Sequence, residues 1–218
     1  RACGVPKARA TRAPSAPWPS SPALAYARAC TGRLISSAMA TPLYGGALVA
    51  MLPAGWIDAS DLRPVPDNQE VWMERAGAER SLVIELMERP DVTDAESAAL
   101  HFDELAAGND ALRSAVVSSQ QLASKPERLG CDPPCFSVCG SQTLVDGEGA
   151  ECQLQVQLLV ARLAEVKTDL LVSISRAVAK PIAIAGKPIA TEEETAADAA
   201  LALSILDSIE IRDKGLFG

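Results

Sequence analysis

The chain has 218 residues, of which 48% are hydrophobic and 4% aromatic, and its formal net charge at pH 7 is −8. A chain of this size can bury a sizeable core, whereas its negative charge argues against nucleic acid as a direct partner. No apolar run approaches the roughly 18 residues that a membrane-spanning helix needs. We therefore expect a globular monomer that contacts neither membrane nor nucleic acid.

Residues 1–38 differ in composition from the rest of the chain. They are rich in Ala, Pro, Ser and Arg, hold six basic residues and no acidic one, and cannot bury a core. We expect a disordered leader, which is either an organelle transit peptide or upstream sequence read through before a start at Met39, and we favour the second alternative. Removing these six from the 20 basic residues leaves 14 against 28 acidic ones, so residues 39–218 carry −14. We expect residues 39–218 to form a single domain that favours a basic protein surface as its partner.

The first predicted elements precede residue 90. The segment 42–56 has a Gly-Gly pair before an apolar run and predicts an edge strand or an extended lead-in. The segment 57–66 predicts a short turn or helical piece, because Pro64 and Pro66 prevent a longer helix. The runs QEVWME and RSLVIELMER predict two strands of a hairpin.

The remaining elements alternate between strands and single helices. Thr93 and Glu96 form a capping-box pattern that predicts a helix over 91–110. Acids in the first turn favour a second helix over 191–209, after a long loop at 179–194. Strands are predicted at 135–145, at 151–163 with half-buried alternation, at 168–177 and at 208–217. In the strand at 168–177, alternation places Leu171 and Ser173 on the face opposite to Leu170, Val172 and Ile174. This order predicts an α+β fold built on an antiparallel sheet.

The sequence offers no recognisable catalytic or metal motif. His101 is the one histidine, lies in the predicted helix, and is interpreted as a structural or surface residue. The chain lacks a nucleophile-elbow pattern and a P-loop, so we expect no catalytic residue. Cys131, Cys135 and Cys139 are spaced by four and lack the CxxC pairs of structural zinc sites. We expect reduced thiols, no metal and no cofactor.

The segment RPVPDNQEVW (63–72) is the most distinctive stretch of the chain. Two prolines fix φ and stiffen it before two acids and two amides. These four residues are Asp67, Asn68, Gln69 and Glu70. We expect Asp67 and Glu70 to lie in an exposed loop. Taken alone, the segment is either a turn followed by a solvated charge or a rigid acidic binding surface.

Several stretches together resemble the Ran guanine nucleotide release factor family, small nuclear proteins that bind the GTPase Ran. They are PLYGGA, LPAGWIDASDLRPVPDNQEVW, SLVIELMER, AALHFDELA, VQLLVARLAEVKTDLLVSIS and SIEIRDKGLFG, and the match covers roughly residues 41 to 218. The resemblance implies the fold of the PsbP photosystem proteins, a twisted antiparallel sheet with helices packed on both faces. It also implies binding to Ran, promotion of guanine nucleotide release, support of nuclear protein import, and a location in nucleus and cytoplasm.

The resemblance also assigns a binding surface. The acidic pair of the family's PD-x-Q-E motif, here Asp67 and Glu70, is implied to contact Ran, with weaker candidates beside it. The complete candidate set is Asp61, Arg63, Asp67, Asn68, Gln69 and Glu70. The chain departs from the pattern at Trp72, in the loop at 177–194 and in the leader. The leader keeps open the alternative of a PsbP-type protein of the thylakoid lumen in a plastid, with residues 1–38 as its transit peptide.

Overall fold

Ten strands and two α-helices make up the described part of the computed structural model, residues 38–75, 80–123, 126–130, 132–145, 147, 149–178 and 190–217. The strands are β1 (Ala38–Leu43), β2 (Leu48–Pro53), β3 (Trp56–Asp58), β4 (Gln69–Glu74), β5 (Arg80–Glu88), β6 (Arg113–Gln121), β7 (Cys135–Val145), β8 (Glu151–Leu163), β9 (Thr168–Val178) and β10 (Glu210–Ile211). The helices are α1 (Asp94–Gly108) and α2 (Glu192–Ser208).

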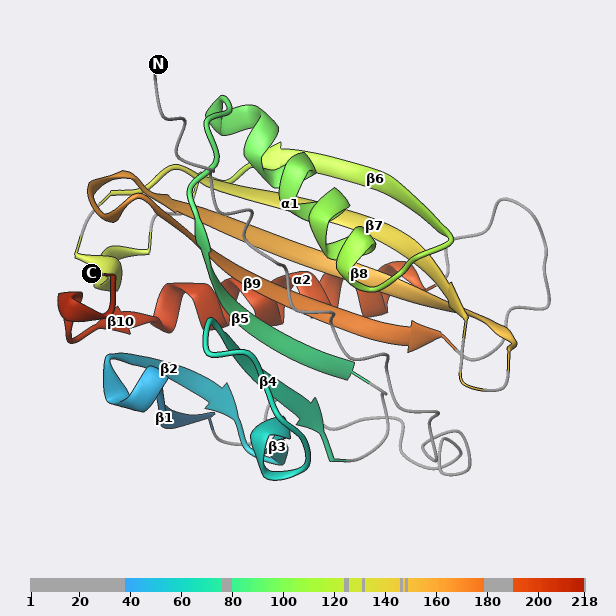
Figure 1. The fold of residues 1–218 in the computed structure, drawn as a ribbon, viewed down its shortest axis with the longest axis horizontal. Helices are drawn as coiled ribbons and strands as arrows, with labels where there is room; N and C mark the ends of the chain where they lie inside the picture. The colour runs from blue at the N-terminus through green and yellow to red at the C-terminus, as the bar shows by residue number, and fades with distance from the viewer. Residues whose placement is uncertain are drawn as a thin grey trace, which may run out of the picture.

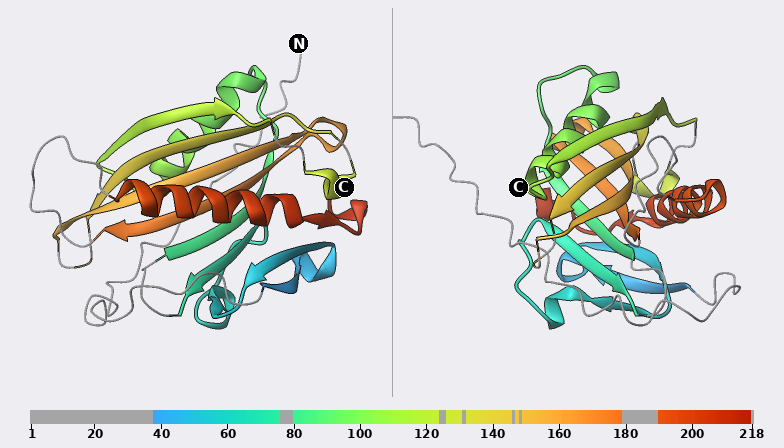
Figure 2. Two further views of the ribbon diagram at one scale, coloured as in Figure 1. Left: turned by 180° about the vertical axis from the view of Figure 1, so that it is seen from behind. Right: turned by 90° about the vertical axis from the view of Figure 1, so that its right-hand side faces the viewer.

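Seven strands form one antiparallel sheet in the order β3-β4-β5-β9-β8-β7-β6, and β1, β2 and β10 form a second, smaller sheet (Figure 1). Helix α1 lies on one face of the large sheet, while α2 lies on the other (Figure 2). Two buried clusters match these layers: one joins α2 and the small sheet to the large sheet, and the other joins α1 to it. The predicted antiparallel α+β architecture with helices on both faces is confirmed.

Strand β9 shows how side-chain alternation builds the two clusters. Leu170, Val172 and Ile174 belong to the cluster under α2, whereas Leu171 belongs to the cluster under α1. The sequence predicted this division, because successive side chains of a strand point to opposite faces of the sheet.

Strand β8 was predicted to be half-buried, and that prediction is wrong. Every residue from 154 to 163 is buried, because both faces of the sheet are covered. Its buried polar side chains are paired: Gln157 Nε2 donates to Ser137 Oγ at 2.9 Å, and Gln155 Nε2 contacts Cys139 Sγ at 2.8 Å. Hydrogen bonding therefore lets glutamine occupy positions that periodicity assigned to solvent.

Three further segments differ from the prediction. The segment 42–56 is not one strand, because the turn at Tyr44–Gly46 folds it into the hairpin β1–β2 and β3 follows. Strand β6 was not predicted, and the last strand is only β10, followed by the 3-10 helix Lys214–Phe217. Residues 1–37 of the leader, the hairpin turn at 76–79 and residues 179–189 of the predicted loop lie outside the described residues, whereas Ala38 begins β1 and residues 192–194 belong to α2.

Both helices begin as their sequences indicate. The backbone N–H of Thr93 donates to the Glu96 carboxylate at 3.1 Å, which confirms the predicted capping box.

The α2 residue Asp198 accepts two hydrogen bonds of 2.7 Å from Arg176 and one of 3.0 Å from Arg80. These charge-assisted bonds fix α2 on the large sheet.

Candidate functional site

The predicted acidic segment forms a tight turn at the start of β4. The backbone N–H of Gln69 donates to the carbonyl oxygen of Pro66 at 2.9 Å, which closes a four-residue turn. Asp67 and Asn68 occupy the two central positions and are exposed. We name the residues Asp67 to Glu70 the acidic tip.

Glu70 does not lie in the exposed loop, which corrects the prediction. It is the second residue of β4 and is half-buried, and its carboxylate accepts a hydrogen bond from the backbone N–H of Tyr44. Burial raises the pKa of Glu70, the Tyr44 hydrogen bond opposes that rise, and the nearby charge of Asp58 adds to it. Glu70 therefore also has a structural task, since it ties β4 to the β1–β2 turn.

Glu85 of β5 holds the two amides of the acidic tip. Its Oε1 accepts from Gln69 Nε2 at 2.8 Å and from Asn68 Nδ2 at 3.1 Å. Gln69 and Glu85 are cross-strand partners, so their side chains share a face of the sheet, opposite to the face of Glu70. Burial raises the pKa of Glu85, and the hydrogen bonds from Gln69 and Asn68 oppose that rise.

Tyr44 supports the tip from the other side. Its hydroxyl lies 3.0 Å from the carbonyl oxygen of Asn68 and 2.9 Å from that of Ile84. Its backbone φ of 50° lies in the left-handed region, which brings the N–H toward Glu70. Burial, followed by the charges of Glu70 and Glu85, raises the pKa of the Tyr44 phenol.

The weaker candidates lie on the segment before the tip. Asp61 ends the 3-10 helix Ala59–Asp61 and is exposed, while Arg63 is half-buried. The 3-10 helix packs beside β4. Asp61 and the tip thus belong to one region of the surface.

Sequence reasoning missed Tyr44 and Glu85. Glu85 stands between Ile84 and Leu86 in an otherwise apolar run, and Tyr44 precedes a Gly-Gly pair. An acid inside a strand and a tyrosine in a turn are visible signals. Only the observed β4–β5 register and the β1–β2 turn bring them to residues 67–70.

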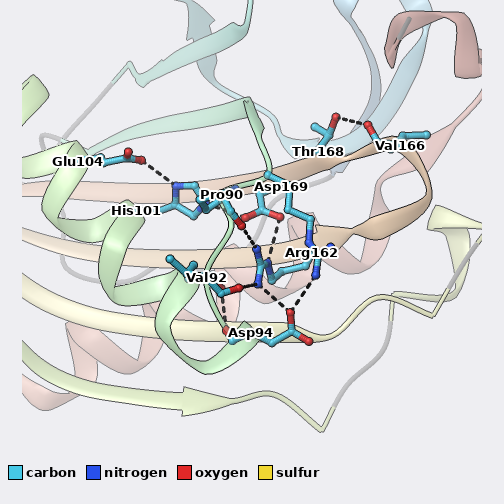
Figure 3. Close-up of polar contacts among 11 residues, drawn as sticks. Pro90, Val92, Asp94, His101, Glu104, Arg162, Val166, Thr168 and Asp169 are labelled. Atoms are coloured by element: carbon cyan, nitrogen blue, oxygen red, sulfur yellow. Dashed lines mark hydrogen bonds and ion pairs between the residues drawn. The ribbon is translucent and has the colours of Figure 1, made fainter.

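A second polar cluster is buried under α1 (Figure 3). His101 Nε2 lies 2.8 Å from Asp169 Oδ2, and His101 Nδ1 lies 3.1 Å from the Glu104 carboxylate. Asp169 also accepts from Arg162 Nε at 3.3 Å, and the side chains of Arg162 and Asp169 are 0% exposed. Burial alone would lower the pKa of His101, but hydrogen bonds to Asp169 and Glu104 outweigh it and raise the pKa. Because the side chains of His101, Arg162 and Asp169 are at most 1% exposed, we interpret the centre of this cluster as structural, in line with the expectation for His101.

Two features of the described residues bear on the class of protein. No group of three or more His, Cys, Asp or Glu side chains among them is arranged to hold a metal ion. Within the same ranges, neither helix is long and apolar enough to cross a membrane.

Known proteins similar in sequence to this chain carry the names of Ran release factors or Mog1 nuclear import proteins. A family model described as "Ran-interacting Mog1 protein" matches residues 41–177. The Ran guanine nucleotide release factor of Bos taurus is 35% identical over 138 residues, which cover 62% of this chain and 74% of the relative. The nuclear import protein mog1 of Schizosaccharomyces pombe is 28% identical over 182 residues, covering 77% and 90%.

A solved structure is similar in fold. The Ran-binding protein Mog1p of Saccharomyces cerevisiae aligns with a TM-score of 0.68 at 22% sequence identity, over 84% of this chain and 100% of that one. A point mutant of Mog1 aligns with a TM-score of 0.66 at 21% identity and the same coverage.

Proposed function

The chain belongs to the family of Ran-interacting Mog1 proteins, and on that premise we propose that it binds the small GTPase Ran and promotes release of guanine nucleotide. It acts as a monomeric regulator of the GTPase and catalyses no covalent step itself. In this role it supports nuclear protein import and is located in the nucleus and cytoplasm. The family match supports this role above all, because curated relatives carry release-factor and nuclear-import names. None of these names favours the photosystem alternative in a plastid.

The acidic tip is the proposed contact with Ran, within a single binding domain at residues 39–218. Asp67 is exposed at the centre of a closed turn, where it can meet a basic side chain without rearranging the loop. Glu70 follows it on β4, and the amides of Asn68 and Gln69 complete the surface. Asp61 and Arg63 flank this contact. A net charge of −14 outside the leader steers a basic partner toward the domain.

Nucleotide release follows from thermodynamic linkage. A partner that binds nucleotide-free Ran more tightly than loaded Ran must weaken nucleotide binding by the same factor. A GTPase holds its nucleotide through Mg²⁺ and a phosphate-binding lysine. A carboxylate of the tip that pairs with a basic side chain of this kind competes with the phosphate for it.

The test compares two charge reversals in the full chain. Asp67→Lys should weaken binding to Ran at least about tenfold, about 1.4 kcal/mol, because attraction becomes repulsion. Its unfolding free energy should change by only about 0.5 kcal/mol, as for an exposed residue. Glu151→Lys is the matched control, since Glu151 begins β8 at the other end of the sheet and its side chain is 53% exposed. It should leave affinity unchanged.

Affinities are measured with Ran loaded with GTP, loaded with GDP and stripped of nucleotide. If the parent chain binds Ran in none of these states, the proposed function is wrong. If the parent binds and Asp67→Lys binds equally well, only the assignment of the tip is wrong. Glu70→Lys is a poorer probe, because it also removes the acceptor of the Tyr44 N–H.

A further inference from the structure

Glu85 occupies a position where a carboxylate weakens the fold. It is half-buried on β5, and its neighbours on the same face, two residues away in each direction, are Val83 and Met87. Burial, together with the negative charge of Glu104, raises its pKa. An apolar side chain at this site would avoid the desolvation of a charge.

The hydrogen bonds of Glu85 go to the acidic tip and not to the core. One oxygen accepts from both Asn68 Nδ2 and Gln69 Nε2, at 3.1 and 2.8 Å. The backbone of the tip is already tied to β5, since the Leu86 N–H donates to the Asn68 carbonyl at 2.9 Å. The carboxylate therefore adds side-chain order at the tip, beyond the backbone pairing that holds the strand.

We propose that Glu85 is a positioning residue for the Ran-binding surface, which fixes the amides of Asn68 and Gln69 in the conformation that receives the partner. This inference rests on the proposed function. Each side chain that is ordered before binding reduces the entropy lost on association. A shell of hydrogen bonds behind a contact surface holds that surface in its productive geometry. Glu85 supplies that shell on one face of β4, opposite Tyr44 and Glu70.

Two substitutions separate acceptance of hydrogen bonds from charge. Glu85→Gln keeps an oxygen that can accept from the tip and removes the charge. Glu85→Met removes both and keeps a side chain of similar length. We expect Glu85→Met to weaken binding to Ran by about tenfold. Gln69 Nε2 loses its acceptor, and Asn68 Nδ2 keeps only its longer contacts to the Leu86 carbonyl oxygen at 3.3 Å and to Met87 Sδ at 3.7 Å. Glu85→Gln should remain within about threefold of the parent. Glu151→Met, at the far end of the sheet, is the control for loss of a negative charge and should bind like the parent.

A double-mutant cycle tests whether Glu85 acts through the tip. In a chain with Asn68→Ala and Gln69→Ala, Glu85→Met should cause no further loss of affinity, since the groups that it positions are gone. The melting temperature of Glu85→Met should equal or exceed that of the parent, because a half-buried charge has been removed. A loss of affinity without a loss of stability is a result that a merely structural role does not produce.

The outcomes distinguish the inference from the function beneath it. If the parent binds Ran and Glu85→Met binds as tightly, the positioning role is wrong. Equal losses for Glu85→Gln and Glu85→Met that add to those of the tip variants would show a direct contact by the charge of Glu85 instead. A Glu85→Met chain that loses affinity only as it unfolds also overturns the inference. If the parent does not bind Ran in any nucleotide state, the proposed function fails and the inference falls with it.

Discussion

Arg162→Met should destabilise the protein strongly, because Arg162 is the centre of the buried polar cluster. Its guanidinium donates to Asp169 and to the carbonyl oxygens of Val92 and Pro90, each carbonyl at 2.9 Å. Removing one partner of a buried ion pair typically destabilises by about 3–5 kcal/mol. Asp169 retains His101 as a partner, so we place the loss near the lower end, at about 3 kcal/mol. That is a large share of the roughly 5–15 kcal/mol that stabilises a domain.

Urea denaturation of the full chain measures this loss as a change in unfolding free energy. Arg113→Met is the matched control, because Arg113 pairs with Glu151 at 2.6 Å while their side chains are 64% and 53% exposed. An exposed pair contributes about 0–1 kcal/mol, so this variant should remain close to the parent. Arg162→Lys should fall between the two, since an ammonium group cannot reproduce the planar fork of arginine. If Arg162→Met loses no more than Arg113→Met, the reasoning is refuted.

Three further predictions concern single side chains. Gly140→Ala should lower the unfolding free energy measured in urea titrations by about 1–3 kcal/mol, because the added Cβ would collide with the Phe102 ring. His101→Gln should lose most stability relative to the parent below pH about 6.5, and the loss should shrink as pH rises through the raised pKa of His101. Urea titrations across pH measure this difference in unfolding free energy, and a difference that grows with pH contradicts the prediction. Glu70→Gln keeps an acceptor for the Tyr44 N–H, and because burial raises the pKa of Glu70 it should raise the melting temperature at pH 7 but not at pH 4.

Elements with strong local signals were predictable from the sequence. The capping box of Thr93 and Glu96 placed the start of α1, and alternation in 168–177 placed β9 and its two faces. Strand β6 escaped prediction because all nine of its residues are exposed, so no burial pattern marks it. Strand β8 misled in the opposite sense, since covering layers on both faces bury its glutamines as well as its leucines. Hydrophobic periodicity predicts a strand from the alternation of buried and exposed side chains. It fails where nearly all side chains are exposed, as in β6, or nearly all are buried, as in β8.

The candidate site was predictable only where it is contiguous. Residues 67–70 stand together in the chain, and the resemblance to a known family identified them. Tyr44 and Glu85 come from other elements, 24 and 17 residues away from Asn68. Their approach to the tip depends on the register of β4 against β5 and on the β1–β2 turn. The pattern along one strand does not reveal this register, which is set jointly by the patterns of both strands and by the geometry of the turn between them.

The buried cluster under α1 and the groups around the acidic tip differ in how their charges are accommodated, and this contrast distinguishes the scaffold from the proposed Ran-binding site. In the cluster under α1, the charge of Arg162 is fully buried and paired with acceptors on α1, β9 and the segment before α1. Around the tip, Glu70 and Glu85 are half-buried carboxylates whose pKa values are raised by burial. Ionising them weakens the fold, yet both are bound to the tip or its supporting turn. Natural sequences depart from the most stable choice chiefly at functional positions. Substitutions at the tip and its supports should therefore alter partner affinity more than stability, whereas substitutions at Arg162 should do the reverse.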